Sequence, residues 1–300
     1  MRVLVTGSNG LVGQKLVRLL DPDPEVELVA TARQPVKGLT KSLSHSLDVT
    51  VSEQVLETIQ SIRPEIVIHT AAMTQVDQCE TEKEACWLNN VTAVEHLVHA
   101  CAMIEAHLIH LSTDFIFDGS YGPLDENAVP HPISYYGDSK WAAEQVVTAS
   151  SIPWTIIRTV LVYGFNPDMS RTNIVLWVKK SLEQGKTIQV VDDQWRTPTL
   201  AEDLATGCVL AARKKAIGIF HISGDEMMTP YQIALKTAEF FGLDKSLIKR
   251  ADSSTFKQPA RRPPKTGFII DKARKELGYR PHSFVEGLAI MARQLKENIS

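Results

Sequence analysis

Close to its N-terminus the sequence reads Val3-Leu4-Val5-Thr6-Gly7-Ser8-Asn9-Gly10-Leu11-Val12-Gly13, with glycines three residues apart where an apolar strand turns into a helix. Gly7 permits a sharp turn, Gly10 lets a phosphate approach the backbone, and Gly13 lets the helix pack closely on the strand. Backbone N–H groups at such a helix N-terminus can hold a pyrophosphate. The pattern predicts a dinucleotide-binding turn; the alternative is a loop that only happens to be rich in glycine. The predicted cofactor contacts are Gly7, Ser8, Asn9, Gly10, Leu11 and Val12.

Beyond this turn, short β-branched runs alternate with longer helix-period segments through about residue 112. Strands buried on both faces by crossover helices have this pattern. It predicts an α/β fold with a Rossmann-type, doubly wound parallel sheet. The expected strands are 3–6, 26–31, 65–70 and 107–112, and the expected helices are 11–20, 51–62 and 88–102.

The regular alternation ends after a helix at 138–149 and an apolar strand at 155–162, which runs into Tyr163 and Gly164. A helix at 202–213 and a strand at 218–223 then read as a return to the sheet, and the last segment combines amphipathic helices with a proline-rich loop. We therefore expect a dinucleotide-binding domain over 1–164 with 199–223 returning to it. A smaller C-terminal α/β substrate-binding domain is expected to hold most of 165–300.

Arg33 stands at the end of the second strand, where a dinucleotide site selective for NAD commonly has an acidic residue. A guanidinium there can pair with a 2′-phosphate, so NADPH is favoured and NADH is left open. The alternative is an exposed arginine on a solvated loop. Asp48 and Val49 follow the next short strand and are expected at the adenine edge, although a surface turn is the competing interpretation.

Tyr136 and Lys140 are four residues apart at a predicted helix start, which places a phenol and an ammonium on one face. An ammonium fixed nearby, together with the charge of an oxidised nicotinamide, is expected to lower the tyrosine pKa from about 10 toward the range of acid–base catalysis. Thr113 lies at the C-terminal end of the 107–112 strand, where ligands bind in open α/β sheets. It can donate a hydrogen bond to the oxygen that Tyr136 protonates; an ordinary exposed helix pair is the alternative.

Composition and charge exclude several other classes. Hydrophobic residues make up 44% and charged residues 22% of the chain, which is typical of a globular protein that is soluble in water. A net charge of -3 provides no basic field for nucleic acid or an anionic membrane. No secretory signal or spanning segment is recognisable, so a cytoplasmic location is expected. Cys79, Cys86, Cys101 and Cys208 lack zinc-ligand spacing and are expected to be reduced, structural thiols.

Several motifs together resemble the extended short-chain dehydrogenase/reductase family, and most closely its dTDP-4-dehydrorhamnose reductase branch. The resemblance covers nearly the whole chain. Besides the glycine turn, it rests on Thr70-Ala71-Ala72-Met73-Thr74, Leu88-Asn89-Asn90, Leu111-Ser112-Thr113-Asp114-Phe115-Ile116-Phe117-Asp118-Gly119, Tyr135-Tyr136-Gly137-Asp138-Ser139-Lys140, and the segment from Asp193-Gln194 through Pro198-Thr199.

This resemblance implies roles for the residues that match. Thr113, Tyr136 and Lys140 would be the catalytic set, and Thr70, Ala71 and Ala72 would line the cofactor. Asn90 would support the site, with a solvent-facing amide as the alternative. Arg158 matches a position near the nicotinamide, although an arginine that closes a strand is as often structural. Sister enzymes that dehydrate the sugar have Glu where this chain has Phe115, which favours plain reduction.

The resemblance also suggests a substrate end. Trp195 can stack on a nucleobase and Arg196 can meet a sugar diphosphate; a structural turn with a packed tryptophan is the alternative. Arg262, in a late Arg-Pro element, is expected to contact a diphosphate or to lie on an exposed basic loop. The predicted substrate-binding residues are Thr74, Thr113, Tyr136, Trp195, Arg196 and Arg262. Some members of the branch bind magnesium through an acidic residue after the glycine turn, where this chain has Gln14 and Lys15, so no metal is expected.

The resulting functional hypothesis is NADPH-dependent reduction of the 4-keto group of a nucleotide-linked 6-deoxy sugar, a step toward a rhamnose precursor. One alternative is an NADP-binding regulatory subunit that resembles the methionine adenosyltransferase β subunit. Another is a reductase or epimerase for a different nucleotide sugar, because one sequence does not reveal pocket shape. A homodimer is compatible with the sequence, and no nucleic-acid or membrane partner is expected.

Overall fold

A computed structural model describes residues 1–167 and 172–298 of the 300-residue chain. Its centre is a parallel sheet of seven strands in the order β10-β6-β5-β4-β1-β2-β3. This is the predicted doubly wound arrangement, in which the strand order reverses beside β1, so the predicted fold class is confirmed. The strands are β1 (Arg2–Thr6), β2 (Glu27–Ala32), β3 (Leu43–Ser46), β4 (Ile66–His69), β5 (His107–Thr113), β6 (Trp154–Thr159) and β10 (Gly218–His221).

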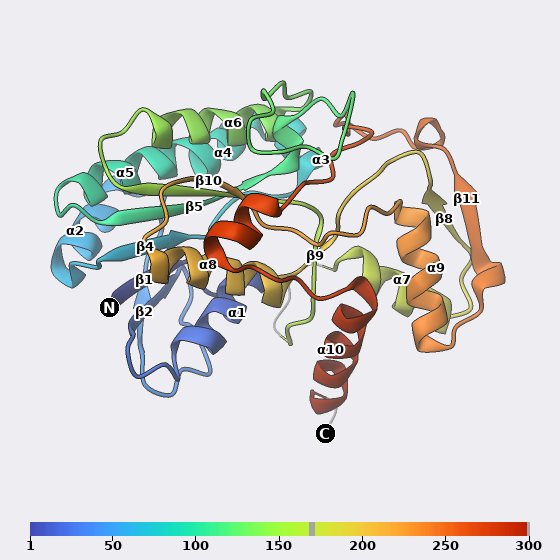
Figure 1. Cartoon of the computed structure of the whole chain (residues 1–300), viewed down its shortest axis with the longest axis horizontal. Helices are drawn as coiled ribbons and strands as arrows, with labels where there is room; N and C mark the ends of the chain where they lie inside the picture. The colour runs from blue at the N-terminus through green and yellow to red at the C-terminus, as the bar shows by residue number, and fades with distance from the viewer. Residues whose placement is uncertain (168–171, 299–300) are drawn as a thin grey trace.

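Helices cover both faces of this sheet (Figure 1). One face carries α1 (Leu11–Leu20) and α8 (Ala201–Lys214), and the other carries α2 (Ser52–Ile62), α5 (Ala93–Ala102) and α6 (Tyr135–Thr148). Side chains alternate along β1 accordingly, because Val3 and Val5 pack in the core under α1 and α8 while Leu4 packs in the core under α2 and α5. This two-sided burial explains why the strands read as unbroken apolar runs.

The predicted helix over 88–102 is part of a longer helical segment. It starts with α3 (Val76–Thr81) and α4 (Lys83–Trp87), passes through the π-helical turn η1 (Leu88–Thr92), and continues as α5. Asn90 lies in the π-turn and is buried with 1% of its surface exposed. The wider turn aims this polar side chain inward at the sheet edge, a placement typical of π-turns near functional sites.

Two predicted boundaries differ from the structure for local reasons. Helix α6 begins three residues earlier than predicted, because the side chain of Ser134 accepts a hydrogen bond from the backbone N–H of Gly137 and caps the helix. The strand predicted over 155–162 ends at Thr159. Leu161 adopts a left-handed φ of 36°, and β7 (Val162–Tyr163) then leaves the sheet to pair with β9 (Thr199–Leu200).

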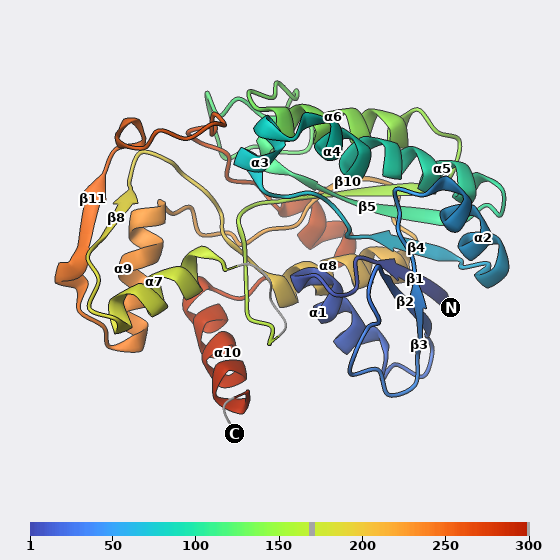
Figure 2. The same ribbon diagram turned by 180° about the vertical axis from the view of Figure 1, so that it is seen from behind.

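A smaller lobe lies beside the sheet (Figure 2). Its core packs α7 (Ile174–Glu183) and α9 (Pro230–Phe241) against a parallel pair of strands, β8 (Ile188–Val191) and β11 (Ile248–Ala251). The C-terminal helix α10 (Phe284–Glu297) packs against α9 and β7, whereas Phe268 and Tyr279 return to the core of the main sheet. The domain boundaries at 164 and 199–223 therefore stay a prediction.

Short helices complete the chain: η2 (Asp114–Ile116), η3 (Lys245–Leu247), η4 (Ser253–Thr255) and the π-turn η5 (Ala273–Leu277). Cys79, Cys86, Cys101 and Cys208 are all buried. Across residues 1–167 and 172–298, none of the helices combines the length and apolar character needed to cross a bilayer.

Candidate functional site

The predicted site residues gather along one edge of the sheet, at the carboxyl ends of neighbouring strands. Gly7 follows β1, Arg33 follows β2 and Asp48 follows β3, while Thr70 follows β4 and Thr113 ends β5. Carboxyl ends of parallel strands meet at one edge, where open α/β sheets bind their ligands. The fold thus brings together residues that are spread over more than a hundred positions of the sequence.

The glycine turn has the geometry expected for a dinucleotide. Gly7 has a φ of +70°, and a Cβ on it would lie 2.7 Å from the backbone nitrogen of Ala71. A Cβ on Gly13 would overlap the carbonyl oxygen of Gly7, so the helix can approach the strand this closely only with glycine there. Gly10 is exposed at the N-cap of α1, and its outer side is open to an anion. These residues therefore fit a pyrophosphate group.

The other predicted residues of this turn contribute mainly through the backbone. The Ser8 hydroxyl is buried and donates a hydrogen bond to the carbonyl of Val5 at 3.0 Å, so its side chain points inward. The Asn9 amide donates to the carbonyl of Gln34 at 2.9 Å and ties the turn to the loop that carries the predicted ribose-recognition residue. Leu11 and Val12 form the half-buried first turn of α1.

Arg33 and Asp48 lie close to each other at this edge. The Arg33 side chain is exposed. Burial would raise the pKa of Asp48, but hydrogen bonds from Thr50 and the positive charge of Arg33 outweigh it and lower that pKa. The Val49 side chain is buried with 8% exposed and packs in the core. A cationic group is thus available beside the second strand, as the preference for NADPH requires.

The loop after β4 is held in place by hydrogen bonds from two directions. Thr70 donates from Oγ1 to the carbonyl of Thr6 at 2.7 Å. Asn90 forms two hydrogen bonds with the backbone of Met73. Its Oδ1 accepts from the Met73 N–H at 2.8 Å, and its Nδ2 donates to the Met73 carbonyl at 3.0 Å. Nδ2 also lies 3.0 Å from Oγ of Ser139 on α6. Asn90 is therefore no solvent-facing amide; it links the loop that contains Ala71 to the helix that contains Tyr136.

Thr113 and Tyr136 form the centre of the site. They are 7% and 8% exposed, and the Thr113 hydroxyl lies near enough to the phenol to oppose the rise of its pKa, while it donates to Asp114 Oδ1 at 3.1 Å. The Phe115 ring packs edge-on against the Tyr136 ring at a centroid distance of 5.7 Å. Gly137 is needed for this approach, because a Cβ on it would overlap the backbone oxygen of Phe115. This constraint was not predicted, although the glycine directly after the tyrosine is its signal in the sequence.

Lys140 lies one turn along α6 from Tyr136 but faces a different set of partners. Its ammonium donates to the carbonyl of Leu111 at 2.7 Å and lies 3.3 Å from Nε2 of His110. Burial lowers the pKa of Lys140 to about 8, although the charge of Glu144 opposes the change. Both side chains sit at the predicted position on one helix, yet each is oriented by its own neighbours.

The side chains of the protein alone do not lower the Tyr136 pKa, and the predicted depression, which includes the charge of an oxidised nicotinamide, stays a prediction. Burial raises the pKa of the phenol strongly, and the negative charge of Asp114 adds to that effect, while the nearby Thr113 hydroxyl only partly offsets it. The Lys140 ammonium donates to the carbonyl of Leu111 and is not among the groups that shift the Tyr136 pKa. A protonated Tyr136 is nonetheless the form that a proton donor requires.

Two buried histidines beside the site were not predicted from the sequence. His69 on β4 and His110 on β5 stack at a centroid distance of 5.6 Å, and His69 Nδ1 lies 2.7 Å from Oγ1 of Thr6. His110 Nδ1 has no hydrogen-bond partner among residues 1–167 and 172–298. Burial lowers the pKa of His69 to about 3, so the ring is neutral at physiological pH. Single polar residues inside apolar strands carry no periodic signal, and only the paired strand register brings these two together.

The residues predicted to bind substrate fall into two groups. Trp195 is half-buried and Thr74 is exposed. Arg196 is only 4% exposed and donates to the carbonyl of Pro263 at 2.7 Å, with its Nε 3.6 Å from Asp114 Oδ2. These contacts are structural and leave little of its guanidinium for a ligand.

Arg262 is partly exposed and pairs with Asp77 on α3, at 2.7 Å between Nη2 and Oδ2. Arg158 also has a structural partner. It is buried and pairs with Glu144 on α6, at 2.7 Å between Nη2 and Oε2. It therefore braces the helix that carries Tyr136.

Lys15, which follows the glycine turn, takes part in an ion pair. Lys15 is buried, donates to the carbonyl of Phe165 at 2.6 Å and pairs with Glu202 at 2.6 Å, and it also reaches Gln294 on α10. In the parts of the chain that the structure describes, no cluster of three or more His, Cys, Asp or Glu side chains has the arrangement of a metal site. The expectation of no metal stays a prediction.

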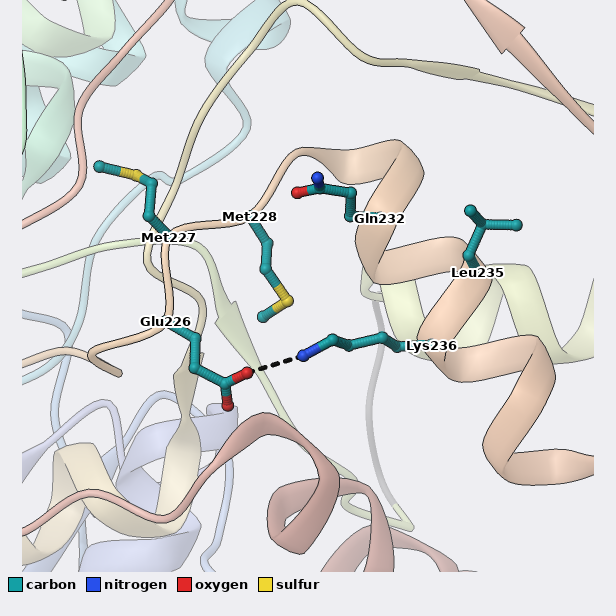
Figure 3. Close-up of a pocket in the computed structure, with 6 residues that line it drawn as sticks. All are labelled: Glu226, Met227, Met228, Gln232, Leu235 and Lys236. Atoms are coloured by element: carbon teal, nitrogen blue, oxygen red, sulfur yellow. Dashed lines mark hydrogen bonds and ion pairs between the residues drawn. The ribbon is translucent and has the colours of Figure 1, made fainter.

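A cavity of about 520 Å³ lies apart from these residues, beside α9 (Figure 3). Glu226 and Lys236 pair across its wall at 2.7 Å. None of the predicted site residues lines it, so the candidate site is defined by the sheet edge and not by this cavity. The lining residues are Glu226, Met227, Met228, Gln232, Leu235 and Lys236.

Comparison with known proteins shows the family and the fold. The chain matches the RmlD substrate binding domain family over residues 1–297. It is 33% identical to the dTDP-4-keto-6-deoxy-D-glucose reductase of Streptomyces niveus over 283 residues, which cover 93% of this chain and 92% of that protein. It is 30% identical to methionine adenosyltransferase 2 subunit beta of Xenopus laevis over 253 residues, which cover 83% of this chain and 74% of that protein.

Among solved structures, the dTDP-4-dehydrorhamnose reductase of Bacillus anthracis in complex with NADP superimposes with a TM-score of 0.88 and 28% identity. The superposition covers 98% of this chain and 99% of that one. The similarity thus includes the smaller lobe as well as the main sheet.

Proposed function

The chain belongs to the RmlD substrate binding domain family, and we propose that this NAD(P)-dependent oxidoreductase reduces the 4-keto group of a nucleotide-linked 6-deoxy sugar, as a dTDP-4-dehydrorhamnose reductase does. The observation that carries the proposal is the buried pair of Thr113 and Tyr136, which lies on the same sheet edge as the glycine turn. The product of this reaction would be a precursor of rhamnose-containing polysaccharide.

The chain's own groups supply the acid and the orientation for this reaction. A bound nicotinamide would supply the hydride. Thr113 holds the carbonyl oxygen by a hydrogen bond, and Tyr136 gives its phenolic proton to that oxygen as negative charge develops there. The raised pKa of Tyr136, caused by burial, keeps the proton on the phenol until a strongly basic oxygen lies beside it. Phe115 offers no second acid–base group, which restricts the site to reduction.

NADPH is the proposed cofactor, with NADH as a second choice. The glycine turn and the loop of Thr70, Ala71 and Ala72 would hold the dinucleotide, and Arg33 would meet the 2′-phosphate. Arg33 is exposed beside the second strand and is therefore available for that contact. The relative from Bacillus anthracis was solved with NADP, which supports the same choice. Trp195 and Arg262 are the proposed contacts for the nucleotide and its diphosphate.

The proposal is tested by NADPH oxidation with dTDP-4-keto-6-deoxy sugar as the substrate. Tyr136→Phe removes only the phenolic oxygen and should lower kcat by about 10²- to 10⁴-fold, the usual contribution of a general acid. Tyr135→Phe is the matched control, because it removes the same oxygen from the neighbouring, half-buried tyrosine. Unchanged NADPH affinity would show that the variant is folded. Full activity of Tyr136→Phe would remove the acid role.

A second candidate function is an NADP-binding regulatory subunit. The similarity to the Xenopus laevis methionine adenosyltransferase subunit favours it, because that relative covers most of this chain. The presence of Tyr136 and Lys140 does not separate the two hypotheses. A thermal-shift screen of nucleotide sugars with NADPH present distinguishes them, since a ligand that binds the native state raises apparent stability. Failure of every nucleotide sugar to bind or turn over, with stable co-purification of a partner enzyme, would favour the regulatory function.

A further inference from the structure

Residues 260–266, here called the strap, cross from the smaller lobe to the sheet edge beside α3 (Figures 1 and 2). The strap packs on the loop after β5, because a Cβ on Gly119 would lie 2.7 Å from the backbone nitrogen of Pro264. Thr113 belongs to the strand that precedes this loop. The strap therefore lies next to the candidate active site, and its attachment to the main domain determines where its side chains point.

One attachment of the strap is buried. Asp114, which is 2% exposed, accepts a hydrogen bond from Thr266 and lies 3.6 Å from Nε of Arg196. Arg196 in turn donates to the carbonyls of Pro263 and Pro264. Breaking a buried, hydrogen-bonded charge pair would leave an uncompensated charge in the interior. This attachment is therefore costly to break, and it explains why Arg196 is structural.

The second attachment is partly exposed and involves Arg262. Asp77 Oδ2 accepts from Nη2 at 2.7 Å, and Oδ1 accepts from Nη1 at 3.1 Å, so the carboxylate grips the end of the guanidinium with both oxygens. Oδ1 also accepts the backbone N–H of Ala260 at 3.1 Å. The Arg262 and Asp77 side chains are 20% and 40% exposed. Asp77 thus fixes both the strap backbone and the orientation of Arg262.

The donors of Arg262 that Asp77 leaves unused form a second edge. The second proton of Nη1 goes to the carbonyl of Ala260 at 3.1 Å. Nε and the remaining proton of Nη2 lie together on the other side of the planar group, and within residues 1–167 and 172–298 nothing accepts from Nε. Two parallel N–H donors of this kind match the oxygens of a phosphate. The edge belongs to a side chain that reaches solvent next to the site.

Resting on the function proposed above, we infer that Asp77 is a positioning residue, which holds one edge of Arg262 so that its Nε–Nη2 edge receives the diphosphate of the nucleotide sugar. Asp77 does not touch the substrate. A guanidinium that is already oriented loses less conformational freedom when an anion binds. Because Asp114 pairs with Arg196 and Asp77 pairs with Arg262, the anion would be held by the oriented N–H donors of Arg262 and not by an excess of positive charge.

The test is calorimetric titration of the NADP-bound protein with thymidine diphosphate, with thymidine as the reference ligand. Asp77→Asn keeps the side-chain shape but loses the two-oxygen grip, and it should weaken thymidine diphosphate binding by about tenfold. Thymidine binding and NADP affinity should be unchanged. In turnover, KM for the keto sugar should rise by a similar factor while kcat changes by less than about twofold, since the interaction is equal in ground and transition states.

Two further variants separate positioning from a merely structural role. In an Arg262→Gln background, Asp77→Asn should cause no further loss, because Asp77 acts through Arg262. Asp23→Asn is the matched control, because Asp23 forms an aspartate–arginine pair with Arg213 on another part of the main domain.

The outcomes of this titration distinguish the two proposals. Equal or tighter binding of thymidine diphosphate by Asp77→Asn would overturn the positioning role alone. No binding of thymidine diphosphate or of any keto sugar by the wild type would overturn the proposed function, and the positioning role with it.

Discussion

Mild acid should destabilise this protein because four histidines are buried in the neutral form. His69, His107, His110 and His221 are each at most 4% exposed. Burial lowers the pKa of His69 and His221 to about 3 and that of His107 to about 4, and it lowers the pKa of His110 well below its ordinary value. Each ring already uses a nitrogen within the fold, for example His107 Nε2 at 2.8 Å from Thr155 Oγ1.

The magnitude follows from proton linkage. In the unfolded chain a histidine titrates near pH 6.5, so below that pH the unfolded state binds protons that the folded state does not. Below that pH each buried histidine lowers the free energy of unfolding by about 1.4 kcal/mol per pH unit. Above the pKa of the unfolded chain it has no such effect. Lowering the pH from about 7.5 to about 5.5 should therefore cost roughly 5 kcal/mol for four such groups. That is a large share of the roughly 5–15 kcal/mol by which folded proteins are stable.

Carboxyl groups with a raised pKa act in the opposite direction, and the buried or half-buried ones matter most. Burial raises the pKa of Asp114, Glu126 and Asp203 in the folded protein, so they take up protons before the unfolded chain does and stabilise the fold as the pH falls. We therefore expect a net loss of roughly 3–5 kcal/mol over the same pH range. The histidines should dominate, because all four are already protonated in the unfolded chain before most carboxyl groups titrate.

The assay is urea unfolding at several pH values, followed by circular dichroism, together with a calorimetric count of protons taken up on unfolding. His107→Gln should remove about one quarter of the histidine-dependent loss, whereas His45→Gln, at an exposed position, should leave the pH dependence unchanged. A loss below about 1 kcal/mol, or an uptake of fewer than about one proton at pH 5.5, would refute the reasoning.

Two substitutions on α6 should also have distinct effects. Glu144→Gln leaves the Arg158 guanidinium buried without its counter-ion, so it should lower the free energy of unfolding by about 3–5 kcal/mol, measured by urea denaturation. Replacing both residues with apolar ones should cost far less. Equal losses in the two variants would contradict the ion-pair explanation. Gly137→Ala places a methyl group against the backbone oxygen of Phe115 and should shift the helix that carries the catalytic tyrosine. Turnover should be abolished while NADP still binds. A wild-type kcat in that variant would contradict the close approach of Gly137 to Phe115.

Much of the cofactor edge could be predicted from the sequence because it depends on local rules. A left-handed φ at Gly7 and the tight contact at Gly13 are backbone requirements that only glycine meets. Strand ends could be located from apolar runs, so Thr113 and Thr70 fell at the correct edge. The alternation of strands and helices predicted a doubly wound parallel sheet, and the structure shows the order of its seven strands.

The orientation of charged side chains could not be predicted in this way. The spacing of Tyr136 and Lys140 placed them on one helix face, yet the Lys140 ammonium turns to the carbonyl of Leu111, which belongs to a neighbouring strand. Arg196 and Arg262 looked equivalent as diphosphate contacts. In the structure one is buried against Asp114 and the other is held at the surface by Asp77.

The sequence by itself determined the parallel sheet, the glycine turn and the identity of the candidate proton donor, because backbone sterics and residue periodicity act over a few neighbouring positions. Only the tertiary structure decided which cations are structural and how the Tyr136 phenol titrates. Asp77 and Arg262 are separated by 185 residues, and Asn90 and Ser139 by 49. Such contacts depend on how distant elements pack and on how deeply each charge is removed from water, and neither quantity is contained in the local spacing of residues.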